Sequence, residues 1–177
     1  TLKAAREGFI AFGFTHGDAL MLSYNGTRPY FGTNPIAFAA PRKEKDPYCL
    51  DMATSLISWN KLQKFRDEGK SLETAVAADR RGFSTKDPLK ATQLFPIGDY
   101  KGFGLASMID ILCGVHTGMS FGRSIPSMFE FDMNSPRHLG QSYIVMRTDL
   151  TISKQRFKKN LKNFLKSSNK NSEFLSS

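Results

Sequence analysis

The chain has 177 residues, a length that suits one domain or a large piece of one. Hydrophobic residues make up 40% of it and 15 residues are phenylalanines, so the chain can bury a sizeable core. No stretch approaches the roughly 20 apolar residues that a membrane-spanning helix requires. The first residues also lack the apolar core of a signal peptide. We therefore expect no membrane partner.

The formal net charge of +9 is unevenly distributed along the chain. Much of it lies in one segment near the end, which contains no acidic residue and carries Lys154, Arg156, Lys158, Lys159, Lys162, Lys166 and Lys170. A uniformly basic chain with recognition motifs would indicate nucleic-acid binding. Neither condition is met, so a solvated helix face is the default interpretation. A basic module that binds nucleic acid or another polyanion is the alternative from a different functional class.

The two cysteines, Cys49 and Cys113, lie in apolar segments far apart in the sequence. This placement favours buried free thiols in a reducing compartment over a disulfide, and we expect a cytoplasmic protein. The sequence contains no run of residues at metal-ligand spacing, so no metal site is predicted.

A short helix and a buried strand are expected first. The helical pattern over Thr1–Glu7 ends at Gly8, and the apolar segment Phe9–Thr15 is rich in strand-forming residues. The turn His16-Gly17-Asp18 follows. Two interpretations of His16 stand side by side: a catalytic base, or the commoner case of a loop residue whose ring is hydrogen-bonded locally.

The next strand lies between two prolines, Pro35 and Pro41. Asn34 precedes the first of them, and a residue before proline is biased towards an extended backbone. We therefore expect the Asn34 amide to point in a fixed direction.

Asp51 ends another apolar strand, and a helix of about residues 56–68 follows it. Thr54 or Ser55 is a candidate cap for this helix. A strand end that runs into a helix start is where open α/β sheets hold ligands. Asp51 could thus accept hydrogen bonds from a ribose, or it could cap the helix itself, and the two roles are compatible.

The glycine-rich stretch Gly98–Gly104 surrounds Lys101 and precedes an apolar run. Glycines let the backbone pass close to another group, and unpaired N–H groups at a helix start favour an anion. The stretch is a candidate phosphate or cofactor contact, and equally a simple turn. The helix after it is expected to run to about Val115 and, being apolar nearly all round, to be buried centrally.

A loop, a strand and a basic helix complete the chain. Arg123 lies in the loop, where it could pair with a carboxylate or tie down the loop. The strand covers 141–146, and residues 149–153 open the last helix. One face of this helix is apolar and the other strongly basic, and from Ser167 onwards the chain is expected to be frayed.

Four segments together resemble the malate/L-lactate dehydrogenase family of nicotinamide-dependent oxidoreductases, which is distinct from the Rossmann-type lactate dehydrogenases. They occur in the family's order and are the segments 32–35 (GTNP), 51–55 (DMATS), 79–88 (DRRGFSTKDP) and 101–105 (KGFGL). The resemblance covers roughly residues 4–165. Shorter matches resemble the ureidoglycolate dehydrogenase branch in particular, at 121–123, 127–128, 139–141 and 144–145.

The resemblance implies an α/β fold with a mixed sheet and flanking helices, and a nicotinamide site that is not of Rossmann type. It implies oxidation of a small 2-hydroxy acid, above all ureidoglycolate to oxalurate in allantoin and purine breakdown. Malate, L-lactate or a sugar acid is the alternative substrate, and a non-catalytic remnant of such an enzyme is a further alternative. The implied cofactor is NAD, with NADP left open, and the implied assembly is a homodimer.

The resemblance also implies which residues bind the cofactor. Asp51, Met52 and Ala53 would line it, Lys101 would meet its phosphate-bearing part, and Gly17 matches a further contact. Gly17 departs from relatives that have a serine there, so only a backbone contact would remain.

No segment matches the family's catalytic histidine, which lies before the Gly-Thr-Asn-Pro motif, or its C-terminal section. The chain therefore resembles the middle and late part of a subunit, and we assign it no catalytic residue. We expect residues 1–150 to form a cofactor-binding domain, followed by a basic helix and polar tail over 151–177. We also expect that this chain alone does not turn over substrate, because hydride transfer needs a base within reach of the hydroxyl.

Overall fold

The computed structural model describes residues 1–43, 46–129, 132 and 134–173. The chain divides into two compact units. The first comprises Thr1–Gly13, Ala37–Asp51 and the chain from Tyr143 onwards, and the second comprises Phe14–Ile36 and Met52–Ser142. The predicted cofactor-binding domain over 1–150 stays a prediction, since a division by function requires the bound cofactor.

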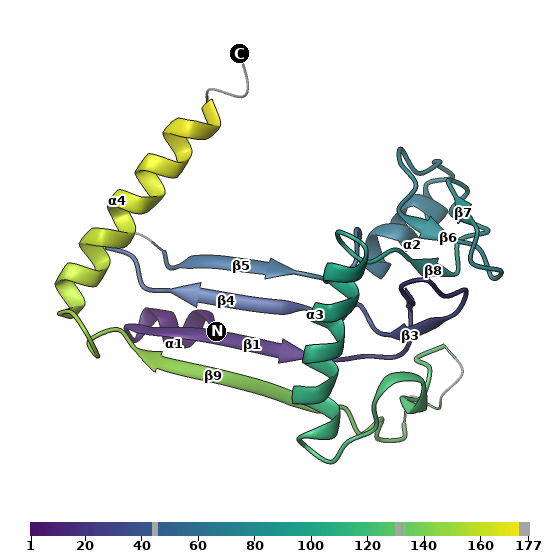
Figure 1. Cartoon of the computed structure of the whole chain (residues 1–177), viewed down its shortest axis with the longest axis horizontal. Helices are drawn as coiled ribbons and strands as arrows, with labels where there is room; N and C mark the ends of the chain where they lie inside the picture. The colour runs from purple at the N-terminus through teal and green to yellow at the C-terminus, as the bar shows by residue number, and fades with distance from the viewer. Residues whose placement is uncertain (44–45, 130–131, 133, 174–177) are drawn as a thin grey trace. The chain divides into compact units, whose positions relative to one another are not determined.

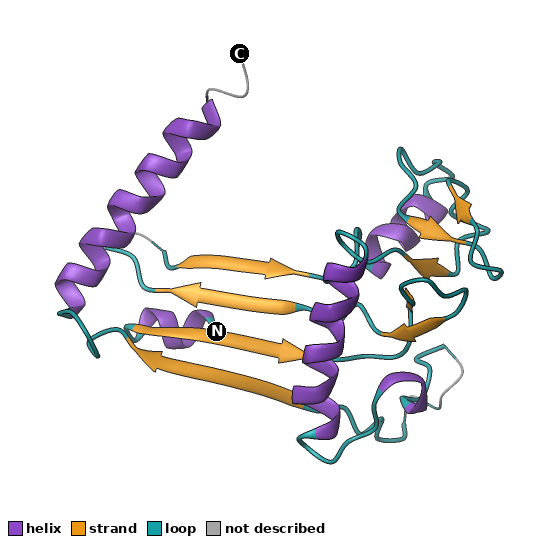
Figure 2. Ribbon diagram, viewed as in Figure 1, coloured by secondary structure: helices purple, strands orange, loops and turns teal. Residues whose placement is uncertain are grey.

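The first unit is built on a four-stranded sheet with the strand order β5-β4-β1-β9. Its strands are β1 (Phe9–Thr15), β4 (Ile36–Ala40), β5 (Tyr48–Met52) and β9 (Gln141–Arg147). Neighbouring strands run in opposite directions (Figure 1; orange in Figure 2). The three strands expected from apolar patterning at these positions are confirmed, and so is the strand predicted over 141–146.

Aromatic pairs join neighbouring strands of this sheet. The Phe12 and Phe38 ring centroids lie 4.8 Å apart, and Phe38 and Tyr48 are 6.0 Å apart in an edge-to-face arrangement. Such cross-strand pairs fix the register of adjacent strands. The helix α1 (Leu2–Arg6) begins against the sheet, because the Cγ2 of Thr1 would lie 3.1 Å from a Cβ added at Gly13.

The basic helix α4 (Lys154–Glu173) completes the first unit. It begins where Ser153 caps it: the Ser153 hydroxyl accepts a hydrogen bond from the Arg156 N–H at 3.3 Å. The expected fraying from Ser167 onwards is wrong as far as the described chain reaches, because the helix continues to Glu173.

The second unit contains a small five-stranded sheet with the order β3-β2-β8-β6-β7. Its strands are β2 (Met21–Leu22), β3 (Pro29–Phe31), β6 (Ala77–Ala78), β7 (Ser84–Thr85) and β8 (Gln93–Leu94). The pair β2–β8 is parallel and the other pairs are antiparallel. The expected α/β class with a mixed sheet is therefore confirmed.

The helix α2 (Trp59–Asp67) lies over one core of the second unit. Leu62 is fully buried in a cluster with Leu72, Ala77, Ala91 and Leu94. Ser58 caps α2, since its hydroxyl accepts from the Lys61 N–H at 3.2 Å. The predicted caps are wrong: the Thr54 hydroxyl donates to the Thr33 carbonyl and Ser55 donates to the Ile57 carbonyl. Asp51 does not cap the helix either.

The helix α3 (Tyr100–Asp110) continues as one turn of π-helix, Ile111–Val115, and a 3₁₀ turn, Gly122–Ser124, follows later. The expected end near Val115 is confirmed, but the expected all-round burial is wrong in this chain. Ala106 and Ile109 are fully buried, whereas Ile111 and Val115 are more than half exposed.

Candidate functional site

Backbone hydrogen bonds bring three motif segments of the second unit side by side. The Thr54 N–H donates to the Thr33 carbonyl at 2.9 Å, and the Ile97 N–H donates to the Thr54 carbonyl at 2.9 Å. Within the second unit, residues 32–35, residues 52–55 and the start of α3 therefore form one connected surface. These segments are far apart in the sequence, so their junction is a product of tertiary folding.

Asn34 connects this surface to the Gly17 turn. It is almost fully buried, its Nδ2 donates to the Ala106 carbonyl at 2.9 Å, and its Oδ1 accepts from the Gly17 N–H at 3.4 Å. The expectation of an extended backbone is wrong, because Asn34 has φ of 25°. Asparagine is one of the few residues that tolerate this region, and the buried amide bonds over-determine it. The Asn34 amide has the fixed direction that we expected.

Gly102 is the point of closest approach in the surface. A Cβ added there would lie 2.5 Å from the N and O atoms of Ile97 and 2.6 Å from the Thr54 carbonyl oxygen. Only glycine fits between two backbones at this distance. Gly102 therefore serves the packing of α3 against the Thr54 segment.

The helix α3 begins at Tyr100, inside the stretch that we expected to precede it. Its early amides are not free for an anion: the Lys101, Gly102 and Phe103 N–H groups donate to carbonyls of residues 98, 97 and 99. The predicted contact through unpaired helix amides is therefore wrong for these three groups. The positive charge that remains at this helix start is the Lys101 side chain.

Lys101 is exposed, and its Nζ lies 6.0 Å from the centroid of the Tyr100 ring. Among the residues that the structure describes, it has no acidic partner. Asp99, which precedes the helix, has φ of 53° and makes no side-chain cap. An exposed, uncompensated ammonium group next to a strained backbone position is available to a negatively charged ligand.

His16 is buried, and each of its two ring nitrogens forms a hydrogen bond, one with Asp110 and one with Gly140. Its Nδ1 lies 3.2 Å from Asp110 Oδ1, and its Nε2 accepts from the Gly140 N–H at 3.0 Å. Because Nε2 accepts, the proton is on Nδ1 and is donated to the carboxylate. Neither partner is local in the sequence, so the expectation of a local hydrogen bond is wrong. With both ring nitrogens engaged, the catalytic-base interpretation also loses its support.

The Asp110 carboxylate is the centre of this buried network. It accepts from His16, from Asn34 Nδ2 at 3.4 Å and from the Gly122 N–H at 2.7 Å. Three donors compensate a carboxylate for the loss of water. The network thus fixes the end of α3, the Gly122 turn and the Gly17 turn relative to one another.

Arg137, and not Arg123, ties down the loop at Pro126. Its guanidinium lies 2.8 Å from Asp18 Oδ1 and also donates to the Pro126 carbonyl. Arg123 has no interaction of this kind within the described residues. No sequence signal identified Arg137, since Asp18 is 119 residues away.

The predicted cofactor residues fall into both units. Gly17, Met52, Ala53 and Lys101 belong to the second unit, where the hydrogen bonds of Asn34 and Thr54 connect their segments. Asp51 belongs to the first unit, where it is exposed in β5.

Two other site classes find no support in the described part of the chain. No group of three or more histidine, cysteine or acidic side chains is placed to hold a metal ion. Within the same residues, no helix combines the length and apolar character needed to cross a membrane.

The sequence profile of the malate/L-lactate dehydrogenase family matches residues 1–174. The chain is 38% identical over 159 residues to the ureidoglycolate dehydrogenase (NAD(+)) of Escherichia coli K12, covering 90% of this chain and 45% of that enzyme. It is 37% identical over 136 residues to the (2R)-3-sulfolactate dehydrogenase (NADP(+)) of Chromohalobacter salexigens, covering 76% of this chain and 41% of that enzyme. The chain thus spans about half the length of these relatives.

Among solved structures, the malate dehydrogenase of Entamoeba histolytica superposes with a TM-score of 0.83 and 26% identity. The match covers 94% of this chain and 50% of that one. The resemblance predicted from the four motif segments and the expected fold are both confirmed.

Proposed function

Because the chain belongs to the malate/L-lactate dehydrogenase family, we propose that it supplies much of the nicotinamide-cofactor site of an enzyme that oxidises a small 2-hydroxy acid. The relatives named above use NAD(+) or NADP(+) and act on 2-hydroxy acids. Both the activity and the cofactor are proposals for this chain, which matches about half of each relative.

One observation carries the proposal: the motif segments around Gly17, Thr33–Asn34, Ala53–Thr54 and Lys101 meet in one hydrogen-bonded surface. The surface ends at an exposed ammonium group without an acidic partner among the described residues. The cofactor's diphosphate carries negative charge, which suits Lys101. The Gly17 turn, fixed by Asn34 and His16, would offer backbone contacts only.

In the proposed reaction, the cofactor would take up the hydride and the protein would bind and orient the cofactor. A bound nicotinamide would accept the hydride from the hydroxyl-bearing carbon, and the hydroxyl proton would go to a base. The residues described here would bind and orient: Lys101 attracts the phosphates, and Gly102 keeps α3 close to the Thr54 segment. No residue of this chain is proposed as the base.

A titration of NADH fluorescence tests the cofactor assignment. Lys101→Ala should weaken NADH binding about tenfold or more, because a hydrogen bond to a charged group contributes about 1.5–3 kcal/mol. Lys61→Ala is the matched control, since Lys61 is also an exposed lysine near the start of a helix and lies outside the connected surface. Equal affinity of the Lys101 variant and the unmodified protein would refute the assignment.

For the substrate, we propose ureidoglycolate, oxidised to oxalurate with NAD in allantoin breakdown. The support is the 38% identity to the Escherichia coli enzyme and the short matches to that branch. In the enzyme purified from its native source, kcat/KM for ureidoglycolate with NAD should exceed the values for malate, L-lactate and 3-sulfolactate at least tenfold. A higher value for any of these acids, or with NADP, would overturn this part of the proposal.

We also propose a cytoplasmic homodimer, by the same resemblance. Light scattering of the native enzyme should give twice the subunit mass. A monomer that still oxidises the acid would contradict this assembly.

A further inference from the structure

Arg137 and Asp18 form a largely buried ion pair beside the Gly17 turn of the second unit. The Arg137 guanidinium lies 2.8 Å from Asp18 Oδ1, and the two side chains are only 18% and 9% exposed. The other Asp18 oxygen, Oδ2, accepts from the Met128 N–H at 3.0 Å. Arg137 also donates to the Pro126 carbonyl. A segment that is 119 residues away along the chain therefore packs against the turn.

The residues on both sides of Gly17 have such anchors. On the other side, His16 Nε2 accepts from the Gly140 N–H at 3.0 Å. Gly17 itself donates its N–H to Asn34 Oδ1 at 3.4 Å. Each residue of the turn from His16 to Asp18 is therefore bonded to a group elsewhere in the second unit.

The turn leaves one side of Gly17 open. Apart from its chain neighbours, no described atom lies within 4 Å of the position that a Cβ would take. A ligand can reach the backbone there, and because Gly17 has no side chain to adjust, the contact depends on where the backbone is held. A turn that is already ordered binds a ligand without the entropic cost of ordering it. A buried ion pair ordinarily only fixes a loop, but this one fixes the backbone next to a proposed cofactor contact.

We propose that Arg137 is a positioning residue for the nicotinamide cofactor. It acts through Asp18, and the ion pair holds the Gly17 turn in the conformation that the bound cofactor contacts. This inference rests on the proposed function, in which Gly17 is a cofactor contact. Loss of the Arg137 cation leaves the Asp18 charge buried and unpaired, and the turn moves to relieve it. The cofactor then has to order the turn, so its affinity falls.

Titrations of NADH fluorescence test the proposal, with each affinity expressed per folded protein and the folded fraction taken from urea unfolding. Arg137→Gln should bind NADH about fivefold more weakly or worse, as is typical of coupled sites. Arg137→Lys keeps a cation beside Asp18 and should bind more tightly than Arg137→Gln. Asp18→Asn should also weaken binding, and the double variant Asp18→Asn/Arg137→Gln should lose no more than either single variant, since the two side chains act as one unit. The double variant leaves no charge unpaired, so it stays folded even where Arg137→Gln does not.

A spectroscopic signal follows the same segment without the cofactor. Trp59 is the only tryptophan of the chain, and the centroid of its ring system lies 5.5 Å from that of Phe129. Phe129 follows Met128, whose N–H is bonded to Asp18. Release of this segment should therefore expose Trp59. We expect its emission to move to longer wavelength in Arg137→Gln and in the double variant, before any NADH is added.

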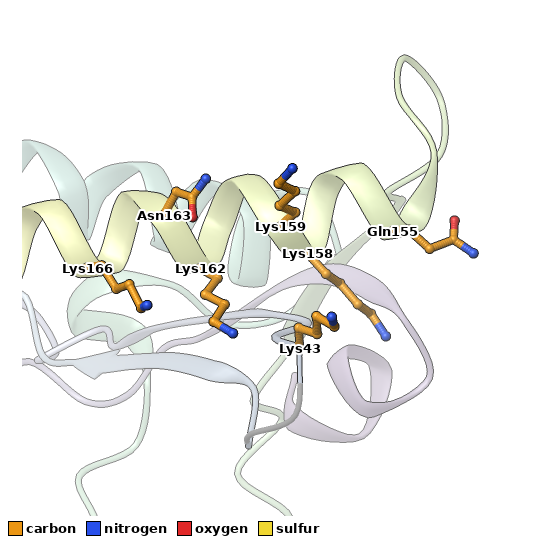
Figure 3. A pocket seen from close by; sticks show the side chains of 7 residues that line it. All are labelled: Lys43, Gln155, Lys158, Lys159, Lys162, Asn163 and Lys166. Atoms are coloured by element: carbon orange, nitrogen blue, oxygen red, sulfur yellow. The ribbon is translucent and has the colours of Figure 1, made fainter.

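Two control variants lie in the first unit. Arg147→Gln breaks an ion pair of similar length, 2.9 Å from Arg147 Nε to Asp149 Oδ1, in which the arginine side chain is 65% exposed. Lys159→Gln removes one positive charge from the groove that Lys43 and side chains of α4 line (Figure 3). Because exposed charges contribute little, both controls should bind NADH within about twofold of the unmodified protein.

Equal NADH affinity of folded Arg137→Gln and the unmodified protein would overturn the positioning role and leave the proposed function intact. Losses in Asp18→Asn and Arg137→Gln that add up in the double variant would overturn it too, since the residues would then act separately. An unshifted Trp59 emission in both variants would show that the segment does not depend on the pair. If the unmodified protein does not bind NADH, the proposed function itself fails, and the positioning role fails with it.

Discussion

Two glycines of α3, two residues apart, have very different surroundings. Gly102 has backbone atoms of Ile97 and Thr54 where a Cβ would go, while Gly104 has no atom within 4 Å of that position. Both glycines cost helix propensity. Gly102 is therefore required by packing, because a side chain would collide with neighbouring backbone, whereas Gly104 has no such requirement.

Gly102→Ala should destabilise the protein by about 1–3 kcal/mol, as overpacking against a rigid neighbour does. Gly104→Ala should stabilise it by about 0.5–1 kcal/mol, because alanine is the better helix former. Urea unfolding of both variants measures the two effects. A Gly102→Ala variant as stable as Gly104→Ala would mean that α3 does not approach the Thr54 segment so closely.

His16 is the residue for which sequence reasoning and structure differ most. His16→Ala would leave the buried Gly140 N–H without an acceptor and take one donor from Asp110. Each buried polar group left unsatisfied costs about 1–3 kcal/mol, so we expect a loss of at least about 2 kcal/mol in urea unfolding. His116 is exposed, and His116→Ala should change stability by less than about 0.5 kcal/mol. Similar losses in the two variants would contradict the network.

The two thiols should differ in reactivity. We expected both to be buried, but Cys49 is exposed and only Cys113 is buried. Burial raises the pKa of the Cys113 thiol, so at a given pH less of it is the reactive thiolate. At pH 8, a disulfide reagent such as Ellman's should titrate one thiol quickly in the folded protein and the second only after unfolding. Two fast thiols in the folded protein would show that Cys113 is accessible.

At the scale of elements, the capping residue of the helix α2 differs from the residues that the sequence suggested. Ser58, not Thr54 or Ser55, caps it, and Ser58→Ala should cost about 1 kcal/mol in urea unfolding. Ser71→Ala is the control, because Ser71 is exposed and its hydroxyl has no partner within the described residues. If the two variants were equally stable, the assigned helix start would be wrong.

Strands with a clear apolar pattern were predictable from the sequence. The strand at Phe9–Thr15 was expected at the residues where β1 lies, since a short apolar run rich in strand-forming residues is a local signature. The start of α3 was not predictable, because glycine propensity argues against a helix through Gly102 and Gly104. The contact of Gly102 with Thr54, 48 residues away in numbering, outweighs that propensity.

The candidate site was predictable only in part for the same physical reason. The resemblance identified Gly17, Asp51, Met52, Ala53 and Lys101, and the cofactor roles of these residues stay predictions. The interactions that hold their segments in place are long-range. His16 and Asp110 are 94 residues apart, and no local pattern links them.

At the scale of the whole molecule, the chain matches its relatives over about half of their length. Its second unit nevertheless has a connected set of motif segments, held by buried hydrogen bonds of Asn34, Thr54 and Asp110. Nicotinamide binding is therefore the activity that we propose for this unit. Binding by the unmodified chain is the central claim of the proposed function.

The most direct test is to follow backbone amide signals by NMR while NADH is added to the protein. We predict that the amides around Gly17, Met52–Ala53 and Lys101 shift together with one saturating affinity, while those of α4 and of Gly69 stay in place. Saturable shifts confined to other residues, or no shifts at millimolar NADH, would contradict the assignment of this surface to the cofactor.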